Sequence, residues 1–201
     1  MKRLFDFIFS VAMLVILLPL FILISFAIKL TSRGPVLFKQ RRIGKDKAEF
    51  NIYKFRSMYA EAPKDVPTHL LQDASRYITP IGKFLRKTSL DELPQLLNII
   101  KGDMSFVGPR PALYNQHDLI SLREKCNVNS IRPGITGWAQ VNGRDELEIP
   151  VKVEYDRYYA EHMSLWFDFK IVIMTVFSVL RAKGVVEGAA KSGSDGGISA
   201  L

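Results

Sequence analysis

Residues 7–28 read FIFSVAMLVILLPLFILISFAI, and this apolar stretch decides how the rest of the chain is interpreted. Its only polar residues are Ser10 and Ser25, and Pro19 stands near its middle. A helix of about twenty apolar residues matches the hydrocarbon core of a bilayer. A basic segment follows instead of a small-residue cleavage site, so we expect a retained membrane helix rather than a cleaved signal peptide.

Positive charges on both sides of this helix bear on its path. Lys2 and Arg3 precede it, and seven cations follow: Lys29, Arg33, Lys39, Arg41, Arg42, Lys45 and Lys47. The positive-inside rule favours both ends in the cytoplasm, which a straight span cannot satisfy. A helix that enters, breaks at Pro19 and returns can satisfy it, because proline removes a backbone donor. We therefore predict a re-entrant membrane helix over residues 1–30, and a single-pass anchor with a proline kink is the alternative.

The length of the remaining chain fits one compact domain. The 201 residues suffice for one compact core, and we assign residues 31–183 to a cytoplasmic domain. Residues 184–201, rich in Gly, Ala and Ser, are expected to form a mobile tail. A net charge of +8 favours a polyanionic partner such as nucleic acid, a phosphate-bearing substrate or an anionic membrane. The single Cys126 excludes an internal disulfide and is interpreted as a buried apolar residue.

The expected secondary structure is mixed α/β and mostly helical. Short strands are predicted at 36–38 and 50–53 around a basic turn at 44–46. Residues 61–80 are polar, contain three prolines and are predicted to form a surface loop. A helix is predicted from about residue 94, or from Asp91, to residue 101, where Gly102 supplies the stop.

The aromatic segment 154–183 is predicted to be one helix. Asp168 and Lys170 interrupt its apolar run, so it is a poor membrane span. An amphipathic helix at the membrane interface, anchored by Arg181 and Lys183, fits it better, and a buried core helix is the alternative. The expected fold is therefore a re-entrant membrane helix joined to a compact cytoplasmic domain with interfacial amphipathic helices and a small β element.

Two adjacent carboxylates, Asp91 and Glu92, are the most informative polar residues. They are predicted at a helix N-terminus, among Arg86, Lys87 and Arg110. One carboxylate can attack phosphorus to form an acyl phosphate, and one can hold Mg²⁺ against a diphosphate. An acidic helix start stabilised by the helix dipole is the simpler alternative.

Arg110 lies between Pro109 and Pro111, which limit its backbone freedom. A planar guanidinium held in this way suits a phosphate clamp, whereas a surface arginine in a turn is the simpler alternative. The chain contains no Walker loop, dinucleotide fingerprint, Cys/His metal cluster or serine elbow. The three histidines lie far apart and are assigned no role.

Four longer strings resemble the bacterial sugar transferase family, the monotopic phosphoglycosyl transferases. They are KFRSM at 54–58, SLDELPQ at 89–95, KGDMSFVGPRP at 101–111 and RPGITGWAQVNGR at 132–144. The similarity runs in order from the apolar segment to about residue 183. The chain resembles the small catalytic form of this family. It departs from the family pattern at the helix break, where Leu18 replaces the serine of the usual Ser-Pro pair.

The resemblance implies transfer of a phosphosugar from a UDP-sugar to polyprenol phosphate, with release of UMP, at the cytoplasmic face of the bacterial inner membrane. This would be the first membrane step of glycoconjugate assembly. Asp91 would be the nucleophile and Glu92 its partner, with Mg²⁺ required. Glu92 could contact the metal, orient Asp91 or assist the acceptor. The phosphate and nucleotide site would be lined by Lys54, Arg56, Arg86, Arg110 and Arg144, with Gln140 as a further candidate.

Two other functions are weighed against this one. A non-catalytic membrane scaffold that binds anionic lipid or a partner enzyme accounts for the anchor and the charge, but not for the carboxylate and arginine sets. A nucleic-acid-binding protein is favoured only by the charge, and no recognition module is present. Expected partners are therefore the two substrates and membrane lipids, with a homodimer left open and no nucleic acid. The sequence does not indicate which UDP-sugar is used.

Overall fold

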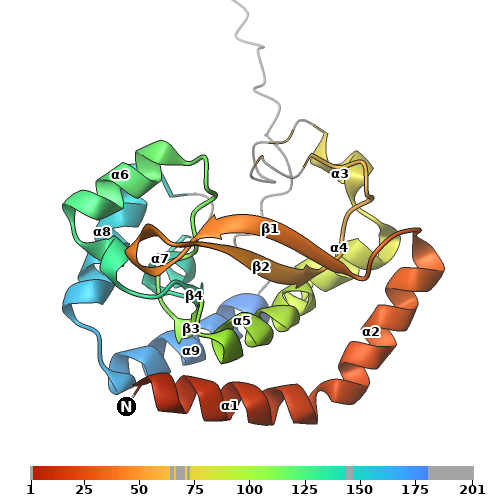
Figure 1. Cartoon of the computed structure of the whole chain (residues 1–201), viewed down its shortest axis with the longest axis horizontal. Coiled ribbons are helices and arrows are strands. Elements are labelled where there is room, and N and C mark those ends of the chain that lie inside the picture. Colours follow the sequence, from red (N-terminus) through yellow and green to blue (C-terminus); the bar gives the residue numbers. More distant parts are fainter. Residues whose placement is uncertain (1, 64–65, 67–70, 72, 144–146, 181–201) are drawn as a thin grey trace, which may run out of the picture.

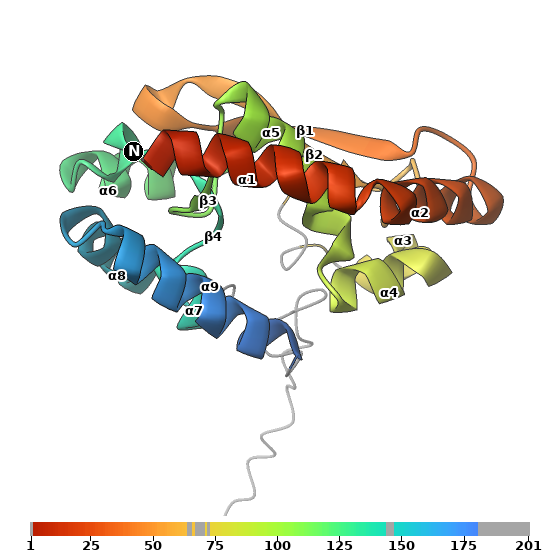
Figure 2. The ribbon, with the colours of Figure 1, turned by 90° about the horizontal axis from the view of Figure 1, so that it is seen from below.

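The computed structural model describes residues 2–63, 66, 71, 73–143 and 147–180. It opens with two helices, α1 (Lys2–Ile16) and α2 (Leu18–Thr31), which follow each other along one side of the molecule (Figures 1 and 2). They bend by 62° at Leu17, and Pro19 lies in the first turn of α2. A break beside Pro19 is thus present. Within the described residues, no single helix is long and apolar enough to cross a membrane, and this bent pair meets that criterion in length and composition only when its two helices are taken together.

Helix α1 has its polar and apolar faces reversed relative to a helix of a soluble protein. Its buried residues are Asp6 and Ser10, whereas Leu4, Phe5 and Ile8 are 58–63% exposed. Asp6 accepts a hydrogen bond from the backbone N–H of Phe106, so its polar side faces the rest of the protein. Such an arrangement is unfavourable in water, because the apolar side chains stay exposed to solvent.

The predicted hairpin is present and is longer than expected. Strands β1 (Leu37–Ile43) and β2 (Glu49–Phe55) pair antiparallel around a short turn, η1 (Lys45–Lys47). Asp46 and Lys47 in this turn have positive φ angles of 53° and 62°. The hairpin crosses the middle of the molecule in Figure 1.

The prediction of a loop over residues 61–80 was wrong at its C-terminal end. Helix α3 (Ala74–Tyr77) lies within it, and α4 (Pro80–Lys87) begins at its last residue. The Thr79 hydroxyl caps α4 by accepting a hydrogen bond from the Gly82 N–H at 3.0 Å. A four-residue helix is too short to show a helical period, which explains the error.

The predicted helix after Asp91 starts as a 3₁₀ turn. Its two parts are η3 (Leu90–Gln95) and α5 (Leu96–Lys101), and Gly102 ends it with a φ of 98° as predicted. A second sheet was not predicted, since its two parallel strands are three residues each. The elements that follow are β3 (Ser105–Val107), α6 (His117–Lys125), η4 (Val128–Ser130), β4 (Gly134–Thr136) and α7 (Trp138–Val141).

The prediction of one helix over 154–183 was also wrong. The chain forms α8 (Ile149–Glu161) and α9 (Leu165–Leu180), and the break falls at residues 162–164. The Ser164 hydroxyl accepts a hydrogen bond from the Phe167 N–H and so starts α9 as a new helix. Asp168 is buried, where it accepts a hydrogen bond from the Tyr159 hydroxyl. The exposed apolar side chains include Trp166 and Phe169, and Arg181, Lys183 and the tail lie outside the described residues.

The core joins the apolar helices to the hairpin and to the carboxylate segment. One cluster packs Ile28 of α2 against Phe55 of β2 and Leu85 of α4. A second packs Ile52 of β2 against Ile99 of α5. These contacts place η3 beside β2 and bring residues 54 and 91–92 together. Cys126, interpreted as buried, is only half-buried, because it packs at the edge of a cluster around Leu119.

Candidate active site

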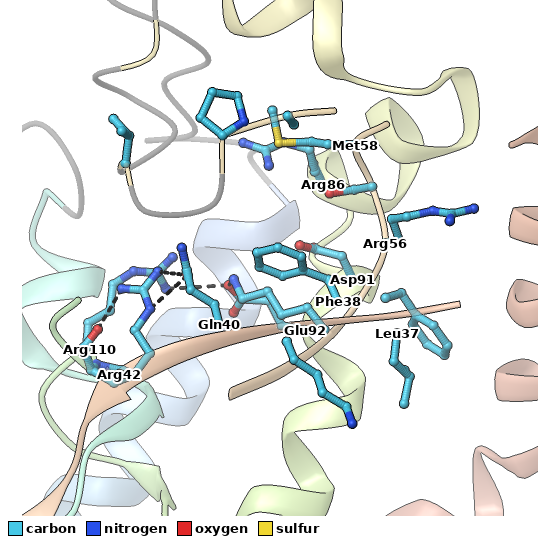
Figure 3. Close-up of a pocket in the computed structure, with 18 of the residues that line it drawn as sticks. Leu37, Phe38, Gln40, Arg42, Arg56, Met58, Arg86, Asp91, Glu92 and Arg110 are labelled. Carbon is cyan, nitrogen blue, oxygen red and sulfur yellow. Dashed lines mark hydrogen bonds and ion pairs between the residues drawn. The ribbon is translucent and has the colours of Figure 1, made fainter. Parts of the chain in front are cut away.

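A cavity of about 530 Å³ opens between the hairpin, η3, α4 and α6 (Figure 3). Six of the eight site residues predicted from the sequence line it: Lys54, Arg56, Arg86, Asp91, Glu92 and Arg110. They come from four separate parts of the chain. The cavity therefore joins most of the predicted phosphate-binding and carboxylate residues in one place.

The two adjacent carboxylates have different partners. Glu92 Oε1 accepts a hydrogen bond from Lys54 Nζ at 2.6 Å and lies 3.5 Å from Arg110 Nη1. Asp91 is only 6% exposed, yet its carboxylate accepts no hydrogen bond from any residue that the structure describes. Its carboxylate lies among cations at the cavity wall (Figure 3). Glu92 is thus held by cations, whereas Asp91 is available to a ligand.

The electrostatics of the dyad follow from its burial. Burial raises the pKa of Asp91, and the positive charge of Lys54 opposes that shift. Burial lowers the pKa of Lys54, and the negative charge of Glu92 opposes it. Arg86 and Arg110 also stabilise ionised Asp91. The cavity therefore combines a poorly solvated carboxylate with several cations, which favours a ligand that carries negative charge.

The local backbone explains how the dyad reaches the cavity. Ser89 has a φ of 56°, and its carbonyl accepts a hydrogen bond from the Glu92 N–H at 3.1 Å. The Ser89 side chain makes no capping hydrogen bond to this turn. Asn98, which is fully buried on α5, accepts a hydrogen bond from the Tyr53 N–H and donates one to the Asn51 carbonyl. Asn98 thereby sets the register between Lys54 and the dyad.

Arg56 lines the cavity but points away from Asp91 (Figure 3). Its guanidinium donates to the carbonyls of Ser32 at 2.7 Å and Arg33 at 2.8 Å, just after α2. These hydrogen bonds tie the segment that follows α2 to the end of β2. The structure therefore gives Arg56 a contact with the end of α2, and the sequence motif did not indicate this.

The other two predicted residues are Gln140 and Arg144. Gln140, on α7, donates to the Ile135 carbonyl at 2.7 Å and is absent from the described lining. Arg144 lies outside the described residues.

The cavity lining also includes residues that the sequence predictions did not assign to the site, among them Gln40, Arg42 and Arg123. Gln40 Oε1 accepts hydrogen bonds from Arg42 Nε at 3.0 Å and Nη2 at 2.5 Å. Gln40 and Arg42 are two residues apart on β1 and share a face with Lys54, whose cross-strand partner is Phe38. Strand alternation from Lys54 could have indicated these two, but no comparable local signal marks Arg123.

The surroundings of the two carboxylates indicate whether they could hold a metal ion. Within the part of the chain that the structure describes, no group of three or more His, Cys, Asp or Glu side chains could hold a metal ion. Mg²⁺ is commonly bound by one or two carboxylates together with substrate phosphates and water. Asp91, which lines the cavity and accepts no hydrogen bond from a described residue, and the adjacent Glu92 fit such a shared ion.

Known proteins resemble this chain over most of its length. The family model described as bacterial sugar transferase matches residues 1–182. The UDP-glucose:undecaprenyl-phosphate glucose-1-phosphate transferase of Escherichia coli (strain K12) is 43% identical over 94% of this chain and 41% of its own length. The uncharacterized sugar transferase EpsL of Bacillus subtilis (strain 168) is 40% identical over 92% of this chain and 90% of its own length.

A third relative is named for a different sugar. It is the UDP-N-acetylgalactosamine-undecaprenyl-phosphate N-acetylgalactosaminephosphotransferase of Aeromonas hydrophila, 39% identical over 91% of this chain and 44% of its own length. The chain thus spans less than half the length of the two named transferases and most of the length of EpsL.

Proposed function

The chain belongs to the bacterial sugar transferase family, and from that premise we propose that it transfers a phosphosugar from a UDP-sugar to undecaprenyl phosphate and releases UMP. The names of the relatives support this donor and acceptor. Two of them specify different UDP-sugars and the same undecaprenyl phosphate acceptor. We therefore propose a UDP-sugar as the class of donor, and a panel of UDP-sugars identifies the particular sugar.

The observation that carries the proposal is the contrast within the dyad. Asp91 is buried at the cavity wall without a hydrogen-bond donor among the described residues, while Lys54 and Arg110 hold Glu92. A carboxylate that is poorly solvated and has cations nearby is a competent nucleophile toward phosphorus. The same cations attract the diphosphate that must approach it.

The reaction has two balanced steps. In the first, an Asp91 carboxylate oxygen attacks the β-phosphorus of the UDP-sugar, and the bond from that phosphorus to the bridging oxygen breaks. UMP leaves with the electron pair, and the phosphosugar remains on Asp91 as an acyl phosphate. In the second, a phosphate oxygen of undecaprenyl phosphate attacks the same phosphorus. The bond to Asp91 breaks, the carboxylate is restored, and undecaprenyl diphosphosugar is formed.

The cations of the cavity stabilise both steps. Arg86 and Arg110 stand near Asp91 and can bind the phosphate oxygens on which charge accumulates. Lys54 holds Glu92 at 2.6 Å and keeps the dyad in place. We propose that Asp91 and Glu92 hold Mg²⁺ together with the diphosphate. When bound, the ion offsets the charge that develops on the leaving phosphate.

The reversed faces of α1 support a membrane site for this reaction. We propose that α1 and α2 dip into the cytoplasmic leaflet, bend beside Pro19 and return, with the cavity facing the cytoplasm. The exposed apolar side chains of α1 and of α9 would then lie in or at the lipid. Single cysteines at positions 2 and 29 of a Cys126→Ser chain should be labelled from the same side of sealed vesicles. Labelling from opposite sides would support the single-pass anchor instead.

The test of the proposed reaction is UMP release from a panel of UDP-sugars with undecaprenyl phosphate and Mg²⁺. The intact protein should release UMP with at least one donor, and Asp91→Asn should release none. Incubation with donor alone should add the mass of one phosphosugar to the intact protein. Release by Asp91→Asn would exclude Asp91 as the nucleophile. Liposome binding without turnover of any donor would favour the scaffold.

A further inference from the structure

The turn that carries Arg110 is held through its carbonyl groups. Residues 109 and 111 are prolines and have no N–H to donate. Four consecutive carbonyls each accept a hydrogen bond of 2.9 Å from another part of the chain: Pro109 from the Gly134 N–H, Arg110 from Arg123 Nη1, Pro111 from Arg42 Nη1 and Ala112 from the Ile43 N–H. The backbone of Arg110 is therefore held on both sides and at its own carbonyl.

The donor to the Arg110 carbonyl belongs to a buried ion pair. Arg123, on α6, is 4% exposed, and Asp156, on α8, is 1% exposed. Arg123 Nε and Nη2 both donate to Asp156 Oδ2, at 3.0 and 2.6 Å. Two bonds to one carboxylate orient the planar guanidinium, which leaves Nη1 directed at the Arg110 carbonyl. The Arg123–Asp156 ion pair thus connects α8 to the turn that carries Arg110.

We propose that Arg123, oriented by Asp156, is a positioning residue that fixes the backbone of Arg110 and so directs the Arg110 guanidinium toward the diphosphate of the donor. The inference rests on the proposed function for the identity of that donor. Arg110 Nη1 lies 3.5 Å from Glu92 Oε1, at the cavity end of its side chain. A small shift of its backbone would move this group away from the dyad, and phosphate clamps tolerate little displacement.

A purely structural role for the ion pair predicts a different result. If the pair only stabilises the contact between α6 and α8, its removal should weaken the fold and affect every step equally. If it positions Arg110, its removal should weaken phosphate binding, and only while Arg110 is present. The two roles are therefore separated by the coupling between Arg123 and Arg110.

The variants are chosen so that the fold survives. Arg123→Met/Asp156→Leu removes both charges together, and apolar replacement of a complete buried ion pair is usually tolerated. Arg123→Lys is the second variant, because one ammonium keeps the charge but cannot reproduce the planar fork. Glu124→Gln is the matched control. Glu124 follows Arg123 on α6, but its exposed carboxylate pairs with Lys47.

The experiment measures UDP binding by titration calorimetry and donor turnover on the same proteins. Arg123→Met/Asp156→Leu should weaken UDP binding about tenfold and raise KM similarly, as expected for a misplaced charge-assisted hydrogen bond. Arg123→Lys should show a smaller loss, and Glu124→Gln none. In the Arg110→Ala chain, replacement of the pair should cause no further loss.

Equal losses with and without Arg110, or unchanged UDP binding in a folded double variant, would overturn the inference. If the double variant does not fold, Arg123→Lys decides by the same comparison. Absence of turnover in the intact protein would instead defeat the proposed function. Coupling of Arg123 to Arg110 in UDP binding would still support the positioning role in that case.

Discussion

Asp91 and Asp156 are both buried aspartates, but they differ in their hydrogen-bond partners. They are 6% and 1% exposed, and burial raises the pKa of each. Asp156 accepts two hydrogen bonds from Arg123, whereas the Asp91 carboxylate accepts none from the residues described. Burial alone therefore does not identify a reactive carboxylate. The presence or absence of a dedicated partner separates the structural aspartate from the candidate nucleophile.

The space around the two aspartates also differs. Asp91 lies at a cavity of about 530 Å³, with Arg86 and Arg110 near enough to influence its ionisation. Asp156 lies between α8 and α6, where Arg123 fills the space next to it. Asp91 therefore borders a space that a ligand could enter, whereas Arg123 occupies the space beside Asp156.

Among these variants, Asp91→Asn should have the largest effect on turnover and little effect on stability. Turnover should fall by about 10⁴-fold or more, because the nucleophile is lost. The melting temperature should stay the same or rise, since a neutral amide removes a poorly solvated charge. UMP release and thermal unfolding in detergent check both parts. A stable variant with substantial activity would make Asp91 another structural aspartate.

Replacement of Asp156 by Ala should have the opposite result. Arg123 would be left buried without its partner, which costs about 3–5 kcal/mol of stability. Chemical unfolding of the variant and of the intact protein measures this loss. Arg123→Met/Asp156→Leu serves as the control and should recover most of it. An equal loss in the control would mean that packing volume, not charge pairing, holds α6 to α8.

Replacement of Arg110 by Ala tests one of the cations near Asp91. A charge-assisted hydrogen bond to phosphate contributes about 1.5–3 kcal/mol, so kcat/KM should fall about 10- to 100-fold. Stability should change little, because the Arg110 side chain is partly exposed. Steady-state kinetics across donor concentrations measure the loss. Unchanged kinetics would return Arg110 to the role of a surface arginine in a turn.

The pH dependence of kcat/KM should give the smallest of these effects. Asp91 must be ionised to attack, and its raised pKa means that activity is lost, as pH falls, above the usual aspartate range. The charge of Lys54 lowers the Asp91 pKa, so Lys54→Met should move this acid limb to higher pH. Lys47→Met, at an exposed cation that does not line the cavity, should leave the limb in place. A limb that moves equally in both variants would contradict the assignment to Asp91.

Local features of the fold were predictable from short stretches of sequence. The helix break beside Pro19, the hairpin around residues 44–46 and the end of α5 at Gly102 each depend on neighbouring residues. The single helix predicted over 154–183 failed because the break at Ser164 replaces one apolar helix by two, with little change in the pattern. Cys126 was expected to be buried and lies at the edge of a cluster instead.

The candidate site was predictable in composition but not in orientation. Lys54, Arg86, Arg110 and the dyad do share a cavity, as the motifs indicated. Arg56 belongs to one of the same motifs, yet its guanidinium contacts the residues after α2. Asn98 and Arg123 were not singled out, because nothing beside them in the sequence distinguishes them from ordinary helix residues.

The sequence by itself determined which segments are apolar, where proline and glycine interrupt them, and which carboxylates stand side by side. These properties arise from neighbours a few residues apart. Only the tertiary structure decided that Glu92 pairs with Lys54, that Arg123 pairs with Asp156, and that no described residue donates a hydrogen bond to the Asp91 carboxylate. Pairings between residues more than thirty positions apart depend on how the core aligns β2, η3, α6 and α8, and no local pattern encodes that alignment.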